Sequence, residues 1–89
     1  MTTGDRAQII EQLKPLLSRA SNGRANVEPL AEDARIIEDI GLASLDLLEL
    51  RFELESTWNA RISDEEAVSL KTIRDVVDVI LAKSKKDAT

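Results

Sequence analysis

The segment 44–58 carries two stripes of apolar side chains on opposite sides of one predicted helix. At about 100° per residue, one side holds Leu47, Leu50, Leu54 and Trp58, and the other holds Leu45, Leu48 and Phe52. A chain of 89 residues forms one domain around one core. Because so small a core cannot cover both sides of a helix, the sequence predicts one buried stripe and one exposed stripe.

The rest of the chain also favours helices. It has 3 glycines, 2 prolines and only two aromatic residues, too few for the turns and bulky side chains of an all-β fold. An amphipathic pattern predicts a first helix over 5–20, in which Pro15 predicts a kink or a break. A long loop up to Ala43 follows, and we expect it to be packed by its own apolar residues or to be functional.

Two capping boxes, Ser63-x-x-Glu66 and Thr72-x-x-Asp75, predict the starts of the last two helices. We therefore expect a single all-α domain over residues 1–89: a small four-helix bundle of three main helices and one short helix, with the long loop between helices one and two. The expected helices cover 5–20, 44–58, 64–69 and 72–83, followed by a frayed tail over 84–89.

Composition excludes several functions. The chain has no His and no Cys, so it lacks the usual general base, the strongest nucleophile and the best transition-metal ligands. A net charge of −5 argues against nucleic-acid binding. The longest apolar run, 79–82, is far below the about 20 residues that span a bilayer, and residues 1–6 do not resemble a secretory signal. We expect a cytoplasmic, non-catalytic protein that binds no metal and no membrane.

Acidic residues concentrate in the middle of the chain. Residues 38–66 carry a net charge of −7 and the remainder +2, so this region is expected to attract basic partners. Within it, Glu49, Glu53 and Glu55 flank the second apolar stripe. An apolar patch rimmed by carboxylates is typical of a transient docking surface. The alternative is that the long loop covers the stripe.

Ser44 lies in the first turn of the same helix. Backbone amides there lack intrahelical partners and the helix dipole is positive, so an anion on the Ser44 hydroxyl is stabilised by about 0.3–1 kcal/mol. A phosphate ester is therefore favourable at this position. The alternative is that Ser44 only caps the helix, a role for which serine is strongly preferred.

The run Asp39-Ile40-Gly41-Leu42-Ala43-Ser44-Leu45-Asp46, continued by Leu47-Leu48-Glu49-Leu50, resembles the phosphopantetheine attachment region of acyl carrier proteins. The order of the expected helices and the long first loop resemble this family over nearly the whole chain.

The resemblance implies that a transferase moves 4'-phosphopantetheine from coenzyme A onto Ser44, and that the terminal thiol of this arm holds acyl groups as thioesters. Such a carrier serves fatty-acid, polyketide or related biosynthesis and catalyses nothing itself. The implied partners of the monomer are the phosphopantetheinyl transferase and acyl-loading and acyl-processing enzymes with basic docking surfaces. A chain without cysteine must obtain its thiol from such a group.

The resemblance also implies which residues touch the partners, namely Leu45, Asp46, Glu49 and Phe52. These overlap with the stripe that periodicity identifies. The expected partner-recognition residues are Leu45, Asp46, Leu48, Glu49, Phe52, Glu53 and Glu55.

Two residues depart from the family pattern. Ala43 stands where the family usually has Asp, and losing that cap costs about 1 kcal/mol unless Ser44 or Asp39 replaces it. Arg51 stands at a position that is usually apolar, where its stem can pack while its head reaches Glu55.

Three other functions are considered. An aminoacyl or peptidyl carrier shares the fold, although peptidyl carriers commonly have Gly-Gly and His or Asp before the serine, and the sequence does not identify the cargo. An unmodified helical module could bind a partner through the second stripe alone. A hydrolase using Asp64 with Glu66, or Glu49 with Glu53, needs a desolvated cleft that so small a bundle hardly offers.

Overall fold

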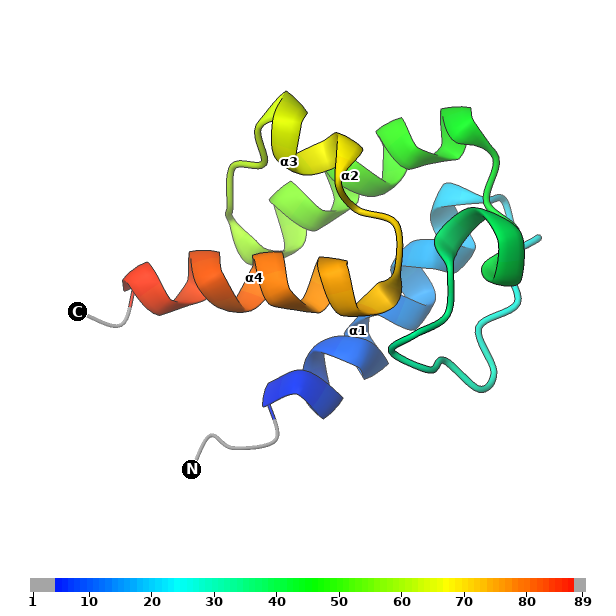
Figure 1. Ribbon diagram of the computed structural model, residues 1–89, viewed down its shortest axis with the longest axis horizontal. Helices are drawn as coiled ribbons and strands as arrows, with labels where there is room; N and C mark the ends of the chain where they lie inside the picture. Colours follow the sequence, from blue (N-terminus) through cyan, green and yellow to red (C-terminus); the bar gives the residue numbers. More distant parts are fainter. Residues whose placement is uncertain (1–4, 88–89) are drawn as a thin grey trace.

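Helix α1 (Asp5–Ala20) is the element on which the main helices pack. The computed structural model describes the backbone of residues 5–87 and the side chains of residues 6–83. In it α1 contacts both α2 (Ser44–Trp58) and α4 (Ile73–Asp87), which run back across it (Figure 1). The helix continues through Pro15, so of the kink or break expected there a break does not occur. Pro15 is exposed, and its ring therefore costs a backbone hydrogen bond without disturbing the core.

The end of α1 is fixed by Ser21, whose side chain is fully buried. Its hydroxyl donates a hydrogen bond to the Leu17 carbonyl at 2.9 Å and accepts one from the Ala25 backbone N–H at 2.8 Å. Asn22 and Gly23 then take left-handed backbone conformations. Because such conformations end a helix, the chain leaves α1 here and turns into the long connection.

The connection 21–43 packs through its own apolar residues, as expected. Its buried apolar residues are Leu30, Ile36, Ile40 and Leu42. It contains one short element that periodicity did not predict, a single π-helical turn over Ile36–Ile40, named η1. Backbone bonds from Ile36 N–H to the Lys71 carbonyl (2.9 Å) and from Ile73 N–H to the Ala34 carbonyl (3.0 Å) hold it against the start of α4.

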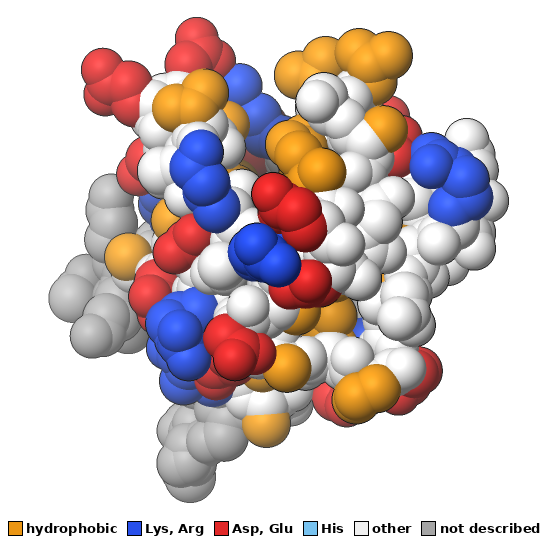
Figure 2. Space-filling view, turned by 45° about the vertical axis from the view of Figure 1, so that its right-hand side comes forward, with side chains coloured by type: hydrophobic (Ala, Val, Ile, Leu, Met, Phe, Trp, Pro, Cys, Tyr) orange, Lys and Arg blue, Asp and Glu red, His pale blue; other side chains and the backbone are white. Residues whose placement is uncertain are grey.

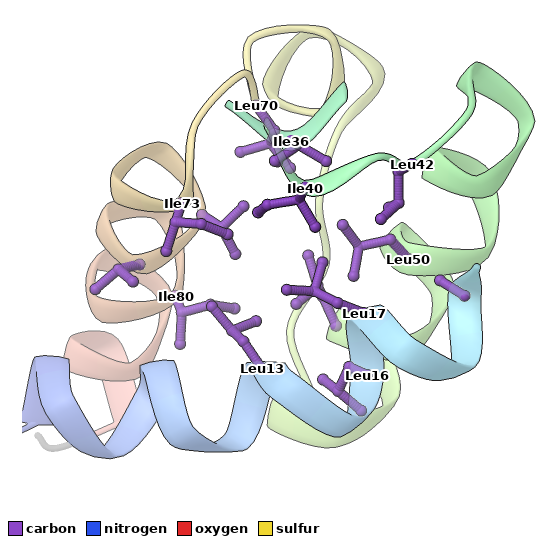
Figure 3. Close-up of a cluster of buried hydrophobic side chains, with 14 of the residues drawn as sticks. Leu13, Leu16, Leu17, Ile36, Ile40, Leu42, Leu50, Leu70, Ile73 and Ile80 are labelled. Carbon is purple, nitrogen blue, oxygen red and sulfur yellow. The ribbon is translucent and has the colours of Figure 1, made fainter. Parts of the chain in front are cut away.

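Helix α2 has the bounds that its periodicity predicts. Leu50 and Leu54 are buried in the core, while Leu47 and Trp58 are half-buried at its border. Figure 3 shows Leu50 directed towards Leu17 of α1 and close to Leu42 of the connection. The first stripe is therefore the core stripe.

The last two helices begin at the predicted caps. Ser63 precedes α3 (Asp64–Val68), where its hydroxyl accepts the Glu66 N–H and the Glu66 carboxylate accepts the Ser63 N–H. Thr72 and Asp75 form the same reciprocal pair before α4. Ile73, Val76, Val77 and Ile80 form the buried face of α4.

The end of α4 corrects the expected boundary. The helix continues to Asp87, so the tail expected from residue 84 is helical over 84–87, and residues 88–89 lie outside the described part. Lysines and serine after Lys83 contain no helix breaker, and positive charge is favourable near a helix C-terminus. The described helices otherwise form the expected all-α bundle, with α3 beside α2 at the top of Figure 1. None of the helices described is of a length and apolarity that would let it cross a bilayer.

Candidate functional site

Ser44 is the first residue of α2 and is exposed to solvent. The residue at the cap position is Ala43, with an extended backbone and no side-chain cap hydrogen bond. Ser44 is therefore not the capping residue, and the alternative that it serves only as a cap is not supported. Its side chain stands at the positive end of a 15-residue helix, in reach of other molecules.

The connection before Ser44 fixes where this helix begins. Gly41 takes a positive φ of 99°, which a glycine adopts without strain. The N–H groups of Gly41 and Leu42 both donate to the Ile36 carbonyl at 3.1 Å, and the Leu42 side chain is buried. Because Leu42 is anchored in the core, the chain can leave the interior within two residues and present Ser44 outside.

Asp46 replaces the missing cap. Its carboxylate accepts a hydrogen bond from the Ala43 backbone N–H at 2.9 Å and pairs with the Arg24 guanidinium at 2.8 Å. The Ala43 N–H first, and then Arg24, lower the pKa of Asp46 below its usual value. The expected substitutes were Ser44 and Asp39, not Asp46; Asp39 instead accepts the Arg35 backbone N–H at 2.8 Å.

The second stripe of α2 is at the surface. Leu45, Leu48 and Phe52 are 77%, 65% and 63% exposed, so the long connection does not cover them. Val68 of α3 is 73% exposed. Together with Leu48 it lines a small hollow between α2 and α3. We call Leu45, Leu48, Phe52 and Val68 the exposed apolar face, and Figure 2 shows hydrophobic side chains at the surface of this upper part of the molecule. Sequence reasoning missed Val68 because a five-residue helix is too short to show a stripe.

The carboxylates beside this face differ in their accessibility. Glu49 is exposed. Glu53 is only 18% exposed and pairs with Arg19 of α1 at 3.1 Å, just as Asp46 pairs with Arg24. Glu55 accepts the Ile62 backbone N–H at 2.8 Å. Of the four acidic residues expected to contact partners, Glu53, Asp46 and Glu55 therefore also make contacts within the chain.

A small apolar hollow separates α2 from α3. Its volume is about 160 Å³, and its wall includes Leu47, Leu50 and Arg51. The Arg51 guanidinium pairs with Asp64 at 2.8 Å, donates to the Ile62 carbonyl, and lies 3.9 Å from Glu55. The head is therefore held mainly by Asp64 and Ile62 at the turn before α3, and the expected partner Glu55 is more distant.

Neither carboxylate pair expected for a hydrolase lies in a desolvated cleft, since in the pair of Glu49 with Glu53 the first is exposed and the second binds Arg19. The Asp64 side chain is 93% exposed, and Glu66 is held by the Ser63 N–H and by Lys83 at 2.9 Å. The Ser63 N–H and Lys83 lower the pKa of Glu66, the opposite of what a general acid near neutral pH requires. Among the described side chains, no three acidic residues come together in a way that could hold a metal ion.

Comparison with known proteins agrees with this geometry. Residues 11–80 match the family model described as the phosphopantetheine attachment site. The acyl carrier protein of Wolinella succinogenes is 38% identical over 72 residues, covering 81% of this chain and 92% of the relative. That of Coprothermobacter proteolyticus is 32% identical over 76 residues, covering 85% and 90%.

A comparison of structures extends the similarity to nearly the whole chain. The crystal structure of the acyl carrier protein from Thermotoga maritima superimposes with a TM-score of 0.84 over 97% of this chain and 98% of that one, at 22% identity. The family model that matches residues 11–80 defines a phosphopantetheine-binding carrier domain. This chain belongs to the acyl carrier protein family. Its prosthetic group is covalently attached 4'-phosphopantetheine, whose thiol carries acyl groups as thioesters.

Proposed function

We propose that Ser44 is the residue that carries the 4'-phosphopantetheine. The observation that supports this most is its position, as an exposed hydroxyl on the first residue of α2. The backbone amides of a first helical turn stabilise a phosphate there by about 0.3–1 kcal/mol. Leu42 is buried on one side and Leu45 is 77% exposed on the other, so Ser44 stands where the chain emerges from the core.

The chain itself acts as a non-catalytic carrier in this proposal. It supplies the attachment oxygen and a surface for enzymes, and the arm supplies the thiol that forms and exchanges thioesters. The chain contains no His and no Cys, so it lacks the usual general base and the strongest side-chain nucleophile. Chemistry on the cargo therefore belongs to the partner enzymes, acting in the cytoplasm.

The partners dock on the exposed apolar face in this proposal. Leu45, Leu48 and Phe52 lie within about 12 Å of Ser44 along the axis of α2, so an enzyme bound to them holds its active site near the arm. Exposed Glu49 is the acidic contact of this face, together with the less accessible carboxylates of Asp46, Glu53 and Glu55. The transferase and the acyl-loading and acyl-processing enzymes would use the same surface in turn.

Loading of the intact chain tests the attachment residue. The protein is incubated with coenzyme A, magnesium and a broad-specificity phosphopantetheinyl transferase, and its mass is measured. We expect the wild type and Ser56→Ala, an exposed serine on the same helix, to gain one phosphopantetheine, and Ser44→Ala to gain none. Loading of Ser44→Ala, or no loading of the wild type by several transferases, would overturn the proposal.

Docking is tested separately from attachment. Phe52→Asp places a charge in the exposed apolar face and should reduce kcat/KM for loading at least tenfold while Ser44 remains present. The control is Ala82→Asp, which adds the same charge at an exposed position of α4. The neighbouring apolar position Val79 is avoided because it contacts the core. Equal loading of Phe52→Asp and Ala82→Asp would show that the transferase does not dock on this face.

A further inference from the structure

The edge of the exposed apolar face that points towards α1 carries arginines as well as carboxylates. Arg19 lies in the last turn of α1, and Arg24 follows shortly after. Their side chains are 61% and 55% exposed, against 18% for Glu53 and 13% for Asp46, with which they pair. The two cations therefore lie further out than the two carboxylates, and a molecule that approaches this edge meets the guanidinium groups first.

Both arginines retain donors for another contact. A guanidinium has five N–H donors. Arg24 uses one nitrogen on Asp46, while Arg19 uses two on Glu53 at 3.1 and 3.4 Å. Isolated surface ion pairs contribute only about 0–1 kcal/mol to stability, so the significance of these pairs lies in where they place charge. The remaining donors can bind a carboxylate of another protein.

Glu49 lies on the same edge but, unlike Glu53 and Asp46, is not covered by an arginine. It is exposed, and none of the ion pairs among the described side chains involves it. It borders an open groove of about 730 Å³ between the end of α1 and α2, which the Arg19–Glu53 pair also lines. A single basic side chain of another protein can reach Glu49 through this groove and pair with its carboxylate. A row of basic side chains along the edge would instead be repelled by Arg19 and Arg24.

We propose that Arg19 and Arg24 select the partner enzymes of this carrier, favouring a docking edge of mixed charge over a uniformly basic one. Such a partner has apolar groups for Leu45, Leu48 and Phe52, one cation for Glu49, and a carboxylate for the arginines. This inference rests on the proposed function of α2 as the docking helix. The expected partners all have basic docking surfaces, and this inference restricts them to those with a carboxylate opposite the two arginines. A cation at that place would be repelled and would select against the partner.

The experiment measures kcat/KM for loading by a transferase whose docking surface is known to be basic, at several ionic strengths. The chains are wild type, Arg19→Gln/Arg24→Gln, and a control with the same charge change elsewhere, Arg61→Gln/Lys71→Gln, both exposed. We expect the Arg19/Arg24 variant to load about threefold faster or more at low salt, with a steeper salt dependence, and the control to resemble wild type. Urea unfolding establishes that all chains are folded.

The converse measurement changes the transferase. Its docking lysines and arginines are replaced by Glu one at a time, and each enzyme is tested on both carriers. At least one replacement should load the wild type as well as or better than before, and load the Arg19/Arg24 variant less well. Loss on both carriers at every position, or equal kinetics of the Arg19/Arg24 variant and the control, would overturn this inference alone. Failure of every chain to load, wild type included, would overturn the proposed function and this inference with it.

Discussion

The carboxylate of Asp46 lies 2.9 Å from the backbone nitrogen of Ala43, closing the first turn of α2 from within the helix. The family usually has an aspartate at the position of Ala43, directly before the modified serine. Here the cap comes from three residues later, on the far side of Ser44. Arg24 pairs with the same carboxylate at 2.8 Å, so the proposed attachment site and the edge of the exposed apolar face share Asp46.

Asp46→Asn should lower the stability of the protein, and the difference should depend on pH. The Ala43 N–H, followed by Arg24, holds the folded pKa of Asp46 below its unfolded value. Its contribution to stability is therefore present above the unfolded pKa, about 3.9, and is lost as the pH falls through the lower folded pKa. Urea unfolding at pH 7 and at pH 3 or below measures this.

The wild type should lose more stability between these pH values than Asp46→Asn does. Asp33→Asn is a suitable control because Asp33 is exposed on the connection, away from α2. If Asp46→Asn and Asp33→Asn lose the same stability on acidification as the wild type, the Asp46 carboxylate does not cap α2.

Leu54→Ala and Leu48→Ala should separate stability from recognition on one helix. Leu54 is fully buried, and its truncation should reduce the free energy of unfolding by about 2–5 kcal/mol. Leu48 is 65% exposed, and its truncation should change stability by no more than about 0.5 kcal/mol while lowering kcat/KM for loading. Urea unfolding and loading kinetics on both variants check this, and similar unfolding midpoints for the two would contradict it.

Ser21→Ala should destabilise the protein by about 1–3 kcal/mol, because it removes the buried hydroxyl that accepts the Ala25 N–H. The measurement is urea unfolding combined with hydrogen exchange, in which the Ala25 amide should lose protection. Ser56→Ala, on the exposed side of α2, provides the matched serine removal and should be nearly neutral. Unchanged exchange at Ala25 would show that this hydrogen bond does not hold the start of the connection.

Glu32→Gln should loosen the connection 21–43 from the helices. The Glu32 carboxylate accepts two hydrogen bonds from Arg6 of α1, at 2.6 and 3.1 Å, and lies 3.6 Å from Arg74 of α4. Arg6 is the main cause of the lowered pKa of Glu32. Its contribution is therefore present above the unfolded pKa, about 4.3, and is lost as the pH falls further.

At pH 7 the Glu32→Gln variant should have a lower Tm than the wild type, and the difference should shrink both at pH 3 and in high salt. Thermal unfolding at three salt concentrations measures this. A Tm difference that is independent of pH and salt would assign the effect of Glu32→Gln to packing and not to charge.

Several features of the fold followed from local sequence. The bounds of α2, its core stripe, the exposure of Leu45, Leu48 and Phe52, and both capping boxes were predicted from residues close together in the chain. Helical periodicity and capping depend on neighbours within four residues, so the sequence alone contains the necessary information. The end of α4 was misjudged because polar residues continue a helix as readily as they leave one.

The remaining features depend on contacts between distant segments. The η1 turn exists because the connection lies against the start of α4, and the pairs Arg19–Glu53 and Arg24–Asp46 exist because the end of α1 lies beside α2. The sequence alone predicts one acidic rim along α2, whereas the fold places an arginine outside the carboxylates of Glu53 and Asp46. Local spacing determines which side of a helix is apolar, but only the packing of helices determines which charges face each other and which remain free for a partner.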